Sequence, residues 1–243
     1  MTVAVVDDYA AEAERLERIL GALTDAQWLT ESGAAGWSVA DVVLHLAQSD
    51  EGVVASAAGA GRLDDGVAGT VDDWAAARVA AERAAPAEVF ARWRRARDAA
   101  VAALRAADPQ APLQWVTGPV KPATLATTRL AEHWAHGLDI TRPLGIGFPD
   151  TARLRHIAWL AHRTLPYALS RAGEAPAAVR CSLTAPDGVS TWAFGPDDAE
   201  STISGPAGAF CRVAARRLDP AASGLHAAGP HADTALRVLR TYA

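Results

Sequence analysis

The sequence predicts an α+β protein in which an all-helical N-terminal domain precedes a smaller α/β domain. Two observations predict this class. Up to about residue 145, apolar residues recur at helical spacing, and the segments between them carry helix caps, Gly or Pro. From about residue 175, short strand-like segments surround a Pro-Asp-Gly turn. We therefore predict a helical domain over residues 1–148, and a linking helix plus a small α/β domain over residues 149–243. The linking helix itself can belong to either part.

Helix boundaries in the N-terminal part follow from caps and prolines. Ser38 precedes an apolar run and Asp41 stands three residues later, which is the spacing of a capping box. Thr24 can cap a short turn. Pro is favoured in the first turn of a helix, where its missing N–H costs nothing, and two prolines stand at such places. Gly- or Pro-rich segments at 59–70 and 107–121 are predicted loops. The predicted helices cover residues 4–23, 38–58, 71 onward, 86–107 and 122–142.

The C-terminal part begins with a helix over residues 151–171, in which we expect Pro166 to kink or end the helix. Residues 178–196 read as two strands around the Pro-Asp-Gly turn, and residues 199–205 as a third. Helical periodicity then returns. The last two predicted helices cover residues 206–218 and 231–243.

Composition excludes some classes of function. The chain has 243 residues and a formal net charge of −5, which argues against a broad nucleic-acid-binding surface. The one dense basic stretch, "RWRRAR" at 92–97, is interpreted as the solvated face of a helix. Two cysteines without metal or redox spacing indicate free thiols in a reducing cytoplasm. No secretory signal or membrane-spanning run is found, and a monomer or a homodimer is compatible with these features.

A possible metal site stands out in "RLAEHWAHGLDI", residues 129–140. Glu132 and His136 are one helical turn apart and share a face. His45 lies among apolar residues of another predicted helix, where a neutral imidazole needs a partner. Two His and one carboxylate form a common catalytic zinc set, and non-haem iron uses a similar one. The alternatives are a simple surface pair for Glu132 and His136, and a hydrogen-bonded core position for His45. We interpret His133 as a packing or surface residue.

Two motifs together, "GWSVADVVLHLAQSD" and, some ninety residues later, "RLAEHWAHGLDI", resemble the DinB-like helical bundle superfamily. More closely, the chain is similar to the actinobacterial family of mycothiol-dependent maleylpyruvate isomerases, over nearly its whole length. The resemblance implies a DinB-like four-helix bundle with a small α/β C-terminal domain. It places the metal ligands on His45, Glu132 and His136, the same residues that spacing suggests. It also implies zinc or another divalent ion, and mycothiol as a thiol cosubstrate.

The resemblance further implies substrate-binding residues. Arg216 and Arg217 are candidates for a cationic substrate anchor, because the C-terminal domain of the family offers an Arg near the mouth of the bundle; the alternative is a solvated helix end. Trp115 and Lys121, in the loop before the second motif, can line the pocket, although core packing explains Trp115 equally well. The charge of Lys121 departs from the family pattern and leaves the substrate class in doubt.

Two carboxylates can orient a metal-bound imidazole, namely Asp50, five residues after His45, and Asp139, three after His136. A helix-surface role suits both equally. His133 stands where relatives often carry a small or hydroxyl residue, and a proton-donor role beside the metal disagrees with its helical position.

Three functions fit these residues. The first is a metal-dependent enzyme that activates a low-molecular-weight thiol for transfer to, or isomerisation of, a small electrophile. The second is a metal-dependent, thiol-independent enzyme of small-molecule or secondary metabolism. The third is a non-catalytic metal-binding protein. Structural zinc sites usually have four protein ligands, whereas three leave an open position, and this difference favours an enzyme.

Overall fold

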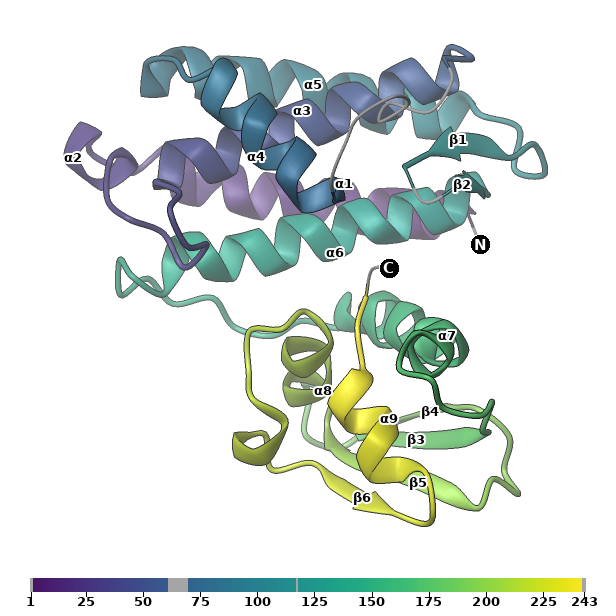
Figure 1. Ribbon diagram of the computed structural model, residues 1–243. Helices are drawn as coiled ribbons and strands as arrows, with labels where there is room; N and C mark the ends of the chain where they lie inside the picture. The colour runs from purple at the N-terminus through teal and green to yellow at the C-terminus, as the bar shows by residue number, and fades with distance from the viewer. Residues whose placement is uncertain (1, 61–69, 117, 242–243) are drawn as a thin grey trace. The chain divides into compact units, whose positions relative to one another are not determined.

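The computed structural model describes residues 2–60, 70–116 and 118–241. The chain divides into two compact units, Met1–Phe148 and Pro149–Ala243 (Figure 1). Each unit is described by itself. In the described parts of the chain, every helix is too short or too polar to cross a membrane.

The first unit is a bundle of four long helices (Figure 1). α1 packs against α5 and α6, and α3 packs against the same two helices from its own side. The predicted helical N-terminal domain is therefore confirmed. The long helices are α1 (Thr2–Leu20), α3 (Val39–Ala57), α5 (Pro86–Ala106) and α6 (Pro122–Thr141), and the shorter α2 (Asp25–Trp28) and α4 (Val71–Ala81) lie in the connections.

Local sequence signals fix where the bundle helices begin. The Ser38 hydroxyl accepts a hydrogen bond from the Asp41 backbone N–H, and the Asp41 carboxylate accepts one from the Ser38 N–H at 3.0 Å. This reciprocal capping box was predicted, and it sets the start of α3. Thr24 caps α2 through a similar box with Gln27. α5 and α6 both begin at a proline.

The segment at 107–121 was predicted to be a loop, but it holds a small antiparallel hairpin. β1 (Leu113–Trp115) pairs with β2 (Gly118–Val120), and Gly118 has φ +106°, which suits glycine. The Ser56 hydroxyl of α3 donates to the Gln114 carbonyl and ties the hairpin to the bundle. Three-residue strands are too short to show an alternating pattern, so the sequence hides them. The predicted loop at 59–70 falls mostly outside the described residues.

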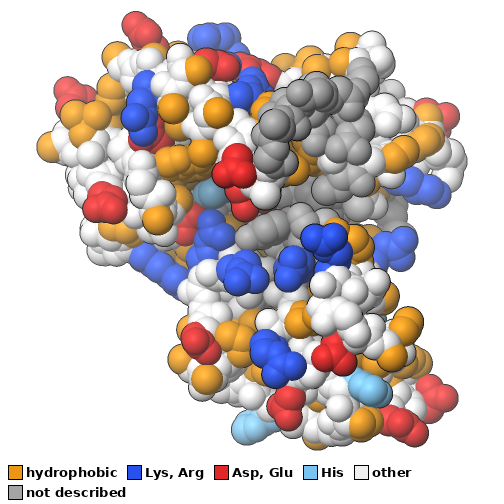
Figure 2. Space-filling model, in the orientation of Figure 1, with side chains coloured by type: hydrophobic (Ala, Val, Ile, Leu, Met, Phe, Trp, Pro, Cys, Tyr) orange, Lys and Arg blue, Asp and Glu red, His pale blue; other side chains and the backbone are white. Residues whose placement is uncertain are grey.

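The basic stretch at 92–97 is not simply a solvated helix face. Trp93 is fully buried on α5 and Arg97 is only 7% exposed. Arg92 pairs with Glu51 and with Glu82, each at 2.7 Å. On the face shown in Figure 2, basic side chains of the first unit lie beside acidic ones. These pairings remove the basic character that the sequence letters suggest.

The second unit is a four-stranded sheet with helices on one face. The strand order is β4-β3-β5-β6, with β3 and β5 parallel and the two outer pairs antiparallel. Alternate β3 residues Val179, Cys181 and Leu183 are buried, so one face of the sheet is covered. The elements are α7 (Leu154–Arg171), β3 (Val179–Thr184), β4 (Thr191–Phe194), β5 (Ser201–Pro206), α8 (Ala207–Ala214), a 3₁₀ turn (Pro220–Ala222), β6 (His226–Ala228) and α9 (Ala232–Val238).

Two details of the second unit differ from the sequence predictions. α7 continues through Pro166, which is exposed, and ends only at Arg171. β6 was not predicted, because its three residues follow a Gly- and Ala-rich segment without alternation. The three predicted strands are all present, and α7 belongs to this unit.

Both cysteines are free and buried in the second unit. Burial raises the pKa of the Cys181 thiol to about 12, and burial together with the charge of Asp150 raises the pKa of the Cys211 thiol. The thiolate is the reactive form, so neither side chain is a ready nucleophile.

We predict that the native protein does not react with Ellman's reagent at mildly alkaline pH, since both thiols stay protonated and covered. The same protein in guanidinium chloride should release two equivalents of chromophore per chain. The absorbance of the released thionitrobenzoate measures both. A rapid one-equivalent burst from the native protein would contradict the prediction.

Candidate metal centre

Glu132 and His136 lie one turn apart on α6, and both point toward α3. Most of α6 is buried, and these two side chains stand on its inward face. His136 Nε2 lies 3.4 Å from Glu132 Oε2. The i,i+4 spacing that singled them out in the sequence therefore brings the imidazole and the carboxylate together.

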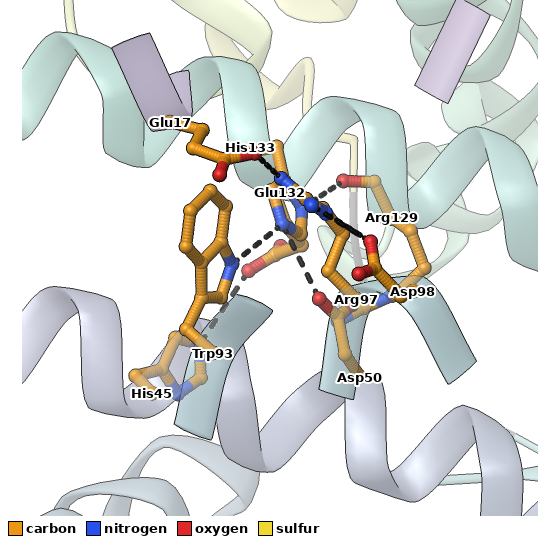
Figure 3. A network of polar contacts seen from close by, with 9 residues as sticks. All are labelled: Glu17, His45, Asp50, Trp93, Arg97, Asp98, Arg129, Glu132 and His133. Carbon is orange, nitrogen blue, oxygen red and sulfur yellow. Dashed lines mark hydrogen bonds and ion pairs between the residues drawn. The ribbon is translucent and has the colours of Figure 1, made fainter. Parts of the chain in front are cut away.

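His45 reaches the same point from α3. Its Nε2 atom lies 3.5 Å from Glu132 Oε2, and the rings of His45 and His136 meet edge to face with centroids 5.0 Å apart. Figure 3 shows His45 below Glu132, joined to it across the gap between the helices. One ligand atom from each of the three residues lies within 4.8 Å of the others. The structure thus brings together the three residues that the sequence proposed as ligands.

The spacing of these atoms fits a bound cation. Distances of 3.4 and 3.5 Å are longer than usual for N–H···O hydrogen bonds, which centre near about 2.9 Å. Two ligands about 2.1 Å from one tetrahedral zinc ion are separated by about 3.4 Å. The side chains of His45, Glu132 and His136 are 16%, 27% and 10% exposed, so the group is reachable from one side. The donor set and its spacing therefore fit a divalent metal with an open coordination position.

The protonation states of two of the three groups suit metal binding, and the third has a proton to lose. Burial lowers the pKa of His45, and the neighbouring His136 lowers it further. Burial alone would raise the pKa of Glu132, but the contacts with His136 and His45 and the charge of Arg129 hold it well below its usual value. Burial opposes the imidazolium of His136, yet contacts with Asp139 and Glu132 raise its pKa. At neutral pH the centre thus offers a neutral imidazole and a carboxylate, and His136 retains its proton most strongly.

Asp139 holds His136 from behind. Its Oδ2 atom lies 2.9 Å from His136 Nδ1, which leaves Nε2 directed at Glu132. The Gly33 N–H donates to the Asp139 carbonyl at 2.7 Å, and a Cβ at Gly33 would lie 3.2 Å from Asp139 Oδ1. The loop before α3 therefore packs against the residue that orients the imidazole.

Sequence analysis missed the role of Trp37 at this centre. Its ring centroid lies 5.1 Å from that of His45 and 6.4 Å from that of His136. It immediately precedes the N-cap of α3, so it begins the helix that carries His45. The sequence shows only that Trp37 stands next to a helix cap. Its contacts with His45 and His136 depend on how α3 packs against α6, which no local pattern indicates.

Asp50 contacts His133 and neither of the candidate ligands His45 and His136, which corrects one sequence prediction. It is fully buried and lies 3.3 Å from His133 Nε2 (Figure 3). Five residues correspond to about 140° around a helix, so Asp50 leaves α3 in a different direction from His45. The predicted alternative, a helix-surface position, is also wrong for Asp50.

His133 is a core residue, one of the two roles predicted for it. Its Nδ1 atom lies 2.9 Å from the Arg129 carbonyl and therefore donates to it, while Nε2 accepts a hydrogen bond from Trp93 Nε1 at 3.2 Å. Figure 3 draws both contacts as dashed lines, and the one with Trp93 directs the ring toward α5.

The four proposed substrate-binding residues are divided between the two units, and each pair is described within its own unit. Trp115 is 6% exposed and packs beneath Arg129, a buried residue that sequence analysis did not single out. Lys121 is exposed at the start of α6 and donates to Gln110 at 3.1 Å. It stands about 16 Å along the helix from Glu132, so it is not beside the three candidate ligands. Its place in a substrate pocket stays a prediction.

Arg216 and Arg217 follow α8 in the second unit. Arg216 adopts a positive φ of 60°, and the Arg217 side chain donates to the Ala215 carbonyl. Their proposed contact with a substrate stays a prediction.

Comparisons with known proteins agree with the family that the two motifs predicted. Residues 9–141 match the model of the mycothiol maleylpyruvate isomerase N-terminal domain. The uncharacterized proteins MT0041 and Rv0036c of Mycobacterium tuberculosis, strains CDC 1551 / Oshkosh and ATCC 25618 / H37Rv, are each 34% identical over 98% of this chain and 95% of theirs.

Two crystal structures of mycothiol-dependent maleylpyruvate isomerase, one of them of a mutant, have the same fold. Their TM-scores are 0.65 and 0.64 at 14% and 15% identity, over 93% of this chain and 92% of theirs. The chain therefore belongs to the family defined by the mycothiol maleylpyruvate isomerase N-terminal domain.

Proposed function

We propose that this protein is a divalent-metal-dependent enzyme that activates a low-molecular-weight thiol, mycothiol, for transfer to a small electrophile or for isomerisation of one. The observation that carries the proposal is that His45, Glu132 and His136 each bring one ligand atom to within 4.8 Å of the others. The family model, named for mycothiol maleylpyruvate isomerase, and two solved structures of mycothiol-dependent maleylpyruvate isomerase with the same fold support the thiol.

His45, Glu132 and His136 would hold the ion, zinc or another divalent metal. When bound, the ion supplies a site at which a thiol loses its proton and becomes a nucleophile at neutral pH. Glu132 contributes the negative charge of the ligand set. The Asp139 carboxylate accepts a hydrogen bond from His136 Nδ1–H, which would keep Nε2 free for the ion. Trp37 packs beside both imidazoles and limits the directions from which water reaches them.

The sulfur nucleophile of this proposal comes from outside the chain. Cys181 and Cys211 are buried in the second unit, and burial raises the pKa of both. A sulfur nucleophile in this reaction would therefore have to be a diffusible thiol and not a side-chain thiolate of this chain.

The deciding experiment is a calorimetric titration of mycothiol into the zinc-loaded full-length chain, into the metal-free chain and into a His136→Ala variant. We expect about one tightly held zinc per wild-type chain, and saturable thiol binding only in its presence. The variant should lose both, because two remaining ligands do not hold the ion. His226→Ala, at an exposed position on β6, is the matched control and should behave as the wild type.

Two other outcomes would overturn different parts of the proposal. One zinc per chain without thiol binding would overturn the thiol and leave the thiol-independent enzyme. Absence of zinc in the wild type after loading, measured by mass spectrometry, would overturn metal dependence altogether.

Zinc affinity should rise with pH, by about tenfold per pH unit while one proton has to leave the site. That proton is on His136, whose pKa is raised by Asp139 and Glu132 against the effect of burial. The rise therefore continues above the usual histidine range and levels off once the pH passes the raised pKa. Competition with a chromophoric chelator across this range measures it. An affinity that is independent of pH below neutrality would contradict the assignment.

Asp139→Asn should weaken zinc binding by about 10- to 100-fold, because the amide no longer stabilises the proton on His136 Nδ1 as a carboxylate does. Asp50→Asn is the matched control. It also removes a buried carboxylate beside a histidine, but that histidine, His133, is not a ligand. Equal losses in the two folded variants, measured with the same chelator, would show that Asp139 has no special role.

A further inference from the structure

Arg129 is a buried cation without an obvious partner. The residue is 5% exposed, and its Nε and Nη1 atoms have no hydrogen-bond acceptor among the residues that the structure describes. Arg97 is a buried arginine with the usual partners. It is 7% exposed and donates hydrogen bonds to the carboxylates of Glu17 and Asp98 (Figure 3). A buried guanidinium with unpaired N–H groups lowers stability, so it calls for an acceptor that arrives from outside.

The aromatic ring of Trp115 supports this guanidinium. The Arg129 Cζ atom lies 4.8 Å from the ring centroid, a cation–π distance. Trp115 is fixed by the β1–β2 hairpin, and Ser56 ties the neighbouring Gln114 to α3. The Trp115 ring covers one face of the guanidinium. The N–H groups lie in the plane of the guanidinium, so they stay available to an anion.

Arg129 stands on the metal-binding side of α6. It precedes Glu132 by one turn and His136 by two, so the three share one face of the helix. Its positive charge lowers the pKa of both Glu132 and His45. The buried carboxylate of Asp50 also has no hydrogen-bond donor among the described residues, but it lies 3.3 Å from His133 Nε2 and makes no described ion pair with Arg129.

We propose that Arg129 and Trp115 form an oxyanion subsite beside the metal centre, and that it takes the carboxylate of a small acidic ligand. A planar guanidinium offers paired N–H donors that match the two oxygens of a carboxylate. Burial strengthens this interaction because water does not compete. As a substrate anchor the subsite rests on the proposed function, but its anion binding is testable without metal or thiol.

The test uses pyruvate as the probe, with the full-length chain treated with EDTA so that a metal cannot bind the carboxylate. Wild type and Arg129→Gln are titrated by calorimetry, with chloride at equal ionic strength as the reference anion. We expect saturable pyruvate binding to the wild type, and at least a tenfold loss in the variant. We also expect the ligand-free Arg129→Gln protein to melt at the same or a higher temperature, since an unpaired buried charge has been removed.

Arg163→Gln is the matched control. Arg163 also stacks on a tryptophan, with Cζ 5.6 Å from the Trp159 ring, but it is exposed on α7. The Arg163→Gln variant should bind pyruvate as tightly as the wild type does. Arg129→Lys keeps the charge but loses the paired donors, and it should bind more weakly than the wild type.

Several results would overturn the proposal. The first is pyruvate binding to the wild type that equals its chloride binding. The second is an Arg129→Gln variant that binds pyruvate as tightly as the wild type. The third is an Arg163→Gln variant that loses as much pyruvate affinity as Arg129→Gln. If Arg129→Gln does not fold, Arg129→Lys decides, and wild-type affinity there would exclude the subsite. Zinc and mycothiol binding are measured separately, so failure of the subsite and failure of the proposed function are distinguishable.

Discussion

The contact between His45 and Glu132 joins α3 to α6 across the interior of the bundle, and the placement of the other polar groups depends on it. Two helices that met only through apolar side chains could rotate and slide by small steps. A polar group that loses its partner inside such a bundle costs about 1–3 kcal/mol. The pairings of His45, Glu132 and His136 therefore restrict α3 and α6 to one register, in which all three ligand atoms meet.

A second polar layer fixes the rotation of α6. His133 donates to the Arg129 carbonyl within α6 and accepts a hydrogen bond from Trp93 on α5, with Asp50 of α3 beside it. Because Nδ1 carries the hydrogen, Nε2 is the acceptor that Trp93 requires. His133 follows Glu132 directly, so holding His133 toward α5 directs Glu132 toward α3. His133, which is not a candidate ligand, thus helps to aim Glu132, which is one.

The features of this arrangement that depend on one helix alone could be predicted from the sequence. The Glu132 and His136 pair, the Ser38 cap and the prolines that open α5 and α6 all follow from spacing along one helix. The short strands and the partners of Trp37 and Arg129 depend on contacts between distant segments, and no local pattern marks those. Helix geometry alone contradicts the predicted role of Asp50, because a step of five residues points Asp50 away from His45. The residue type was misleading at Arg97, because a basic side chain suggested a solvent-exposed position. Its three hydrogen bonds to two carboxylate oxygens, one of Glu17 and one of Asp98, allow its burial.

The charges of the first unit bear on what kind of site this is. A centre that only stored a divalent cation would gain from carboxylates around it and lose from a nearby guanidinium. Here Arg129 is buried on the same face of α6 as Glu132, and its charge reaches both Glu132 and His45. Such a cation opposes the metal but favours anions, and both effects are stronger away from water. The arrangement is therefore suited to a cation and a negatively charged ligand together, which is what a thiolate or an acidic substrate requires.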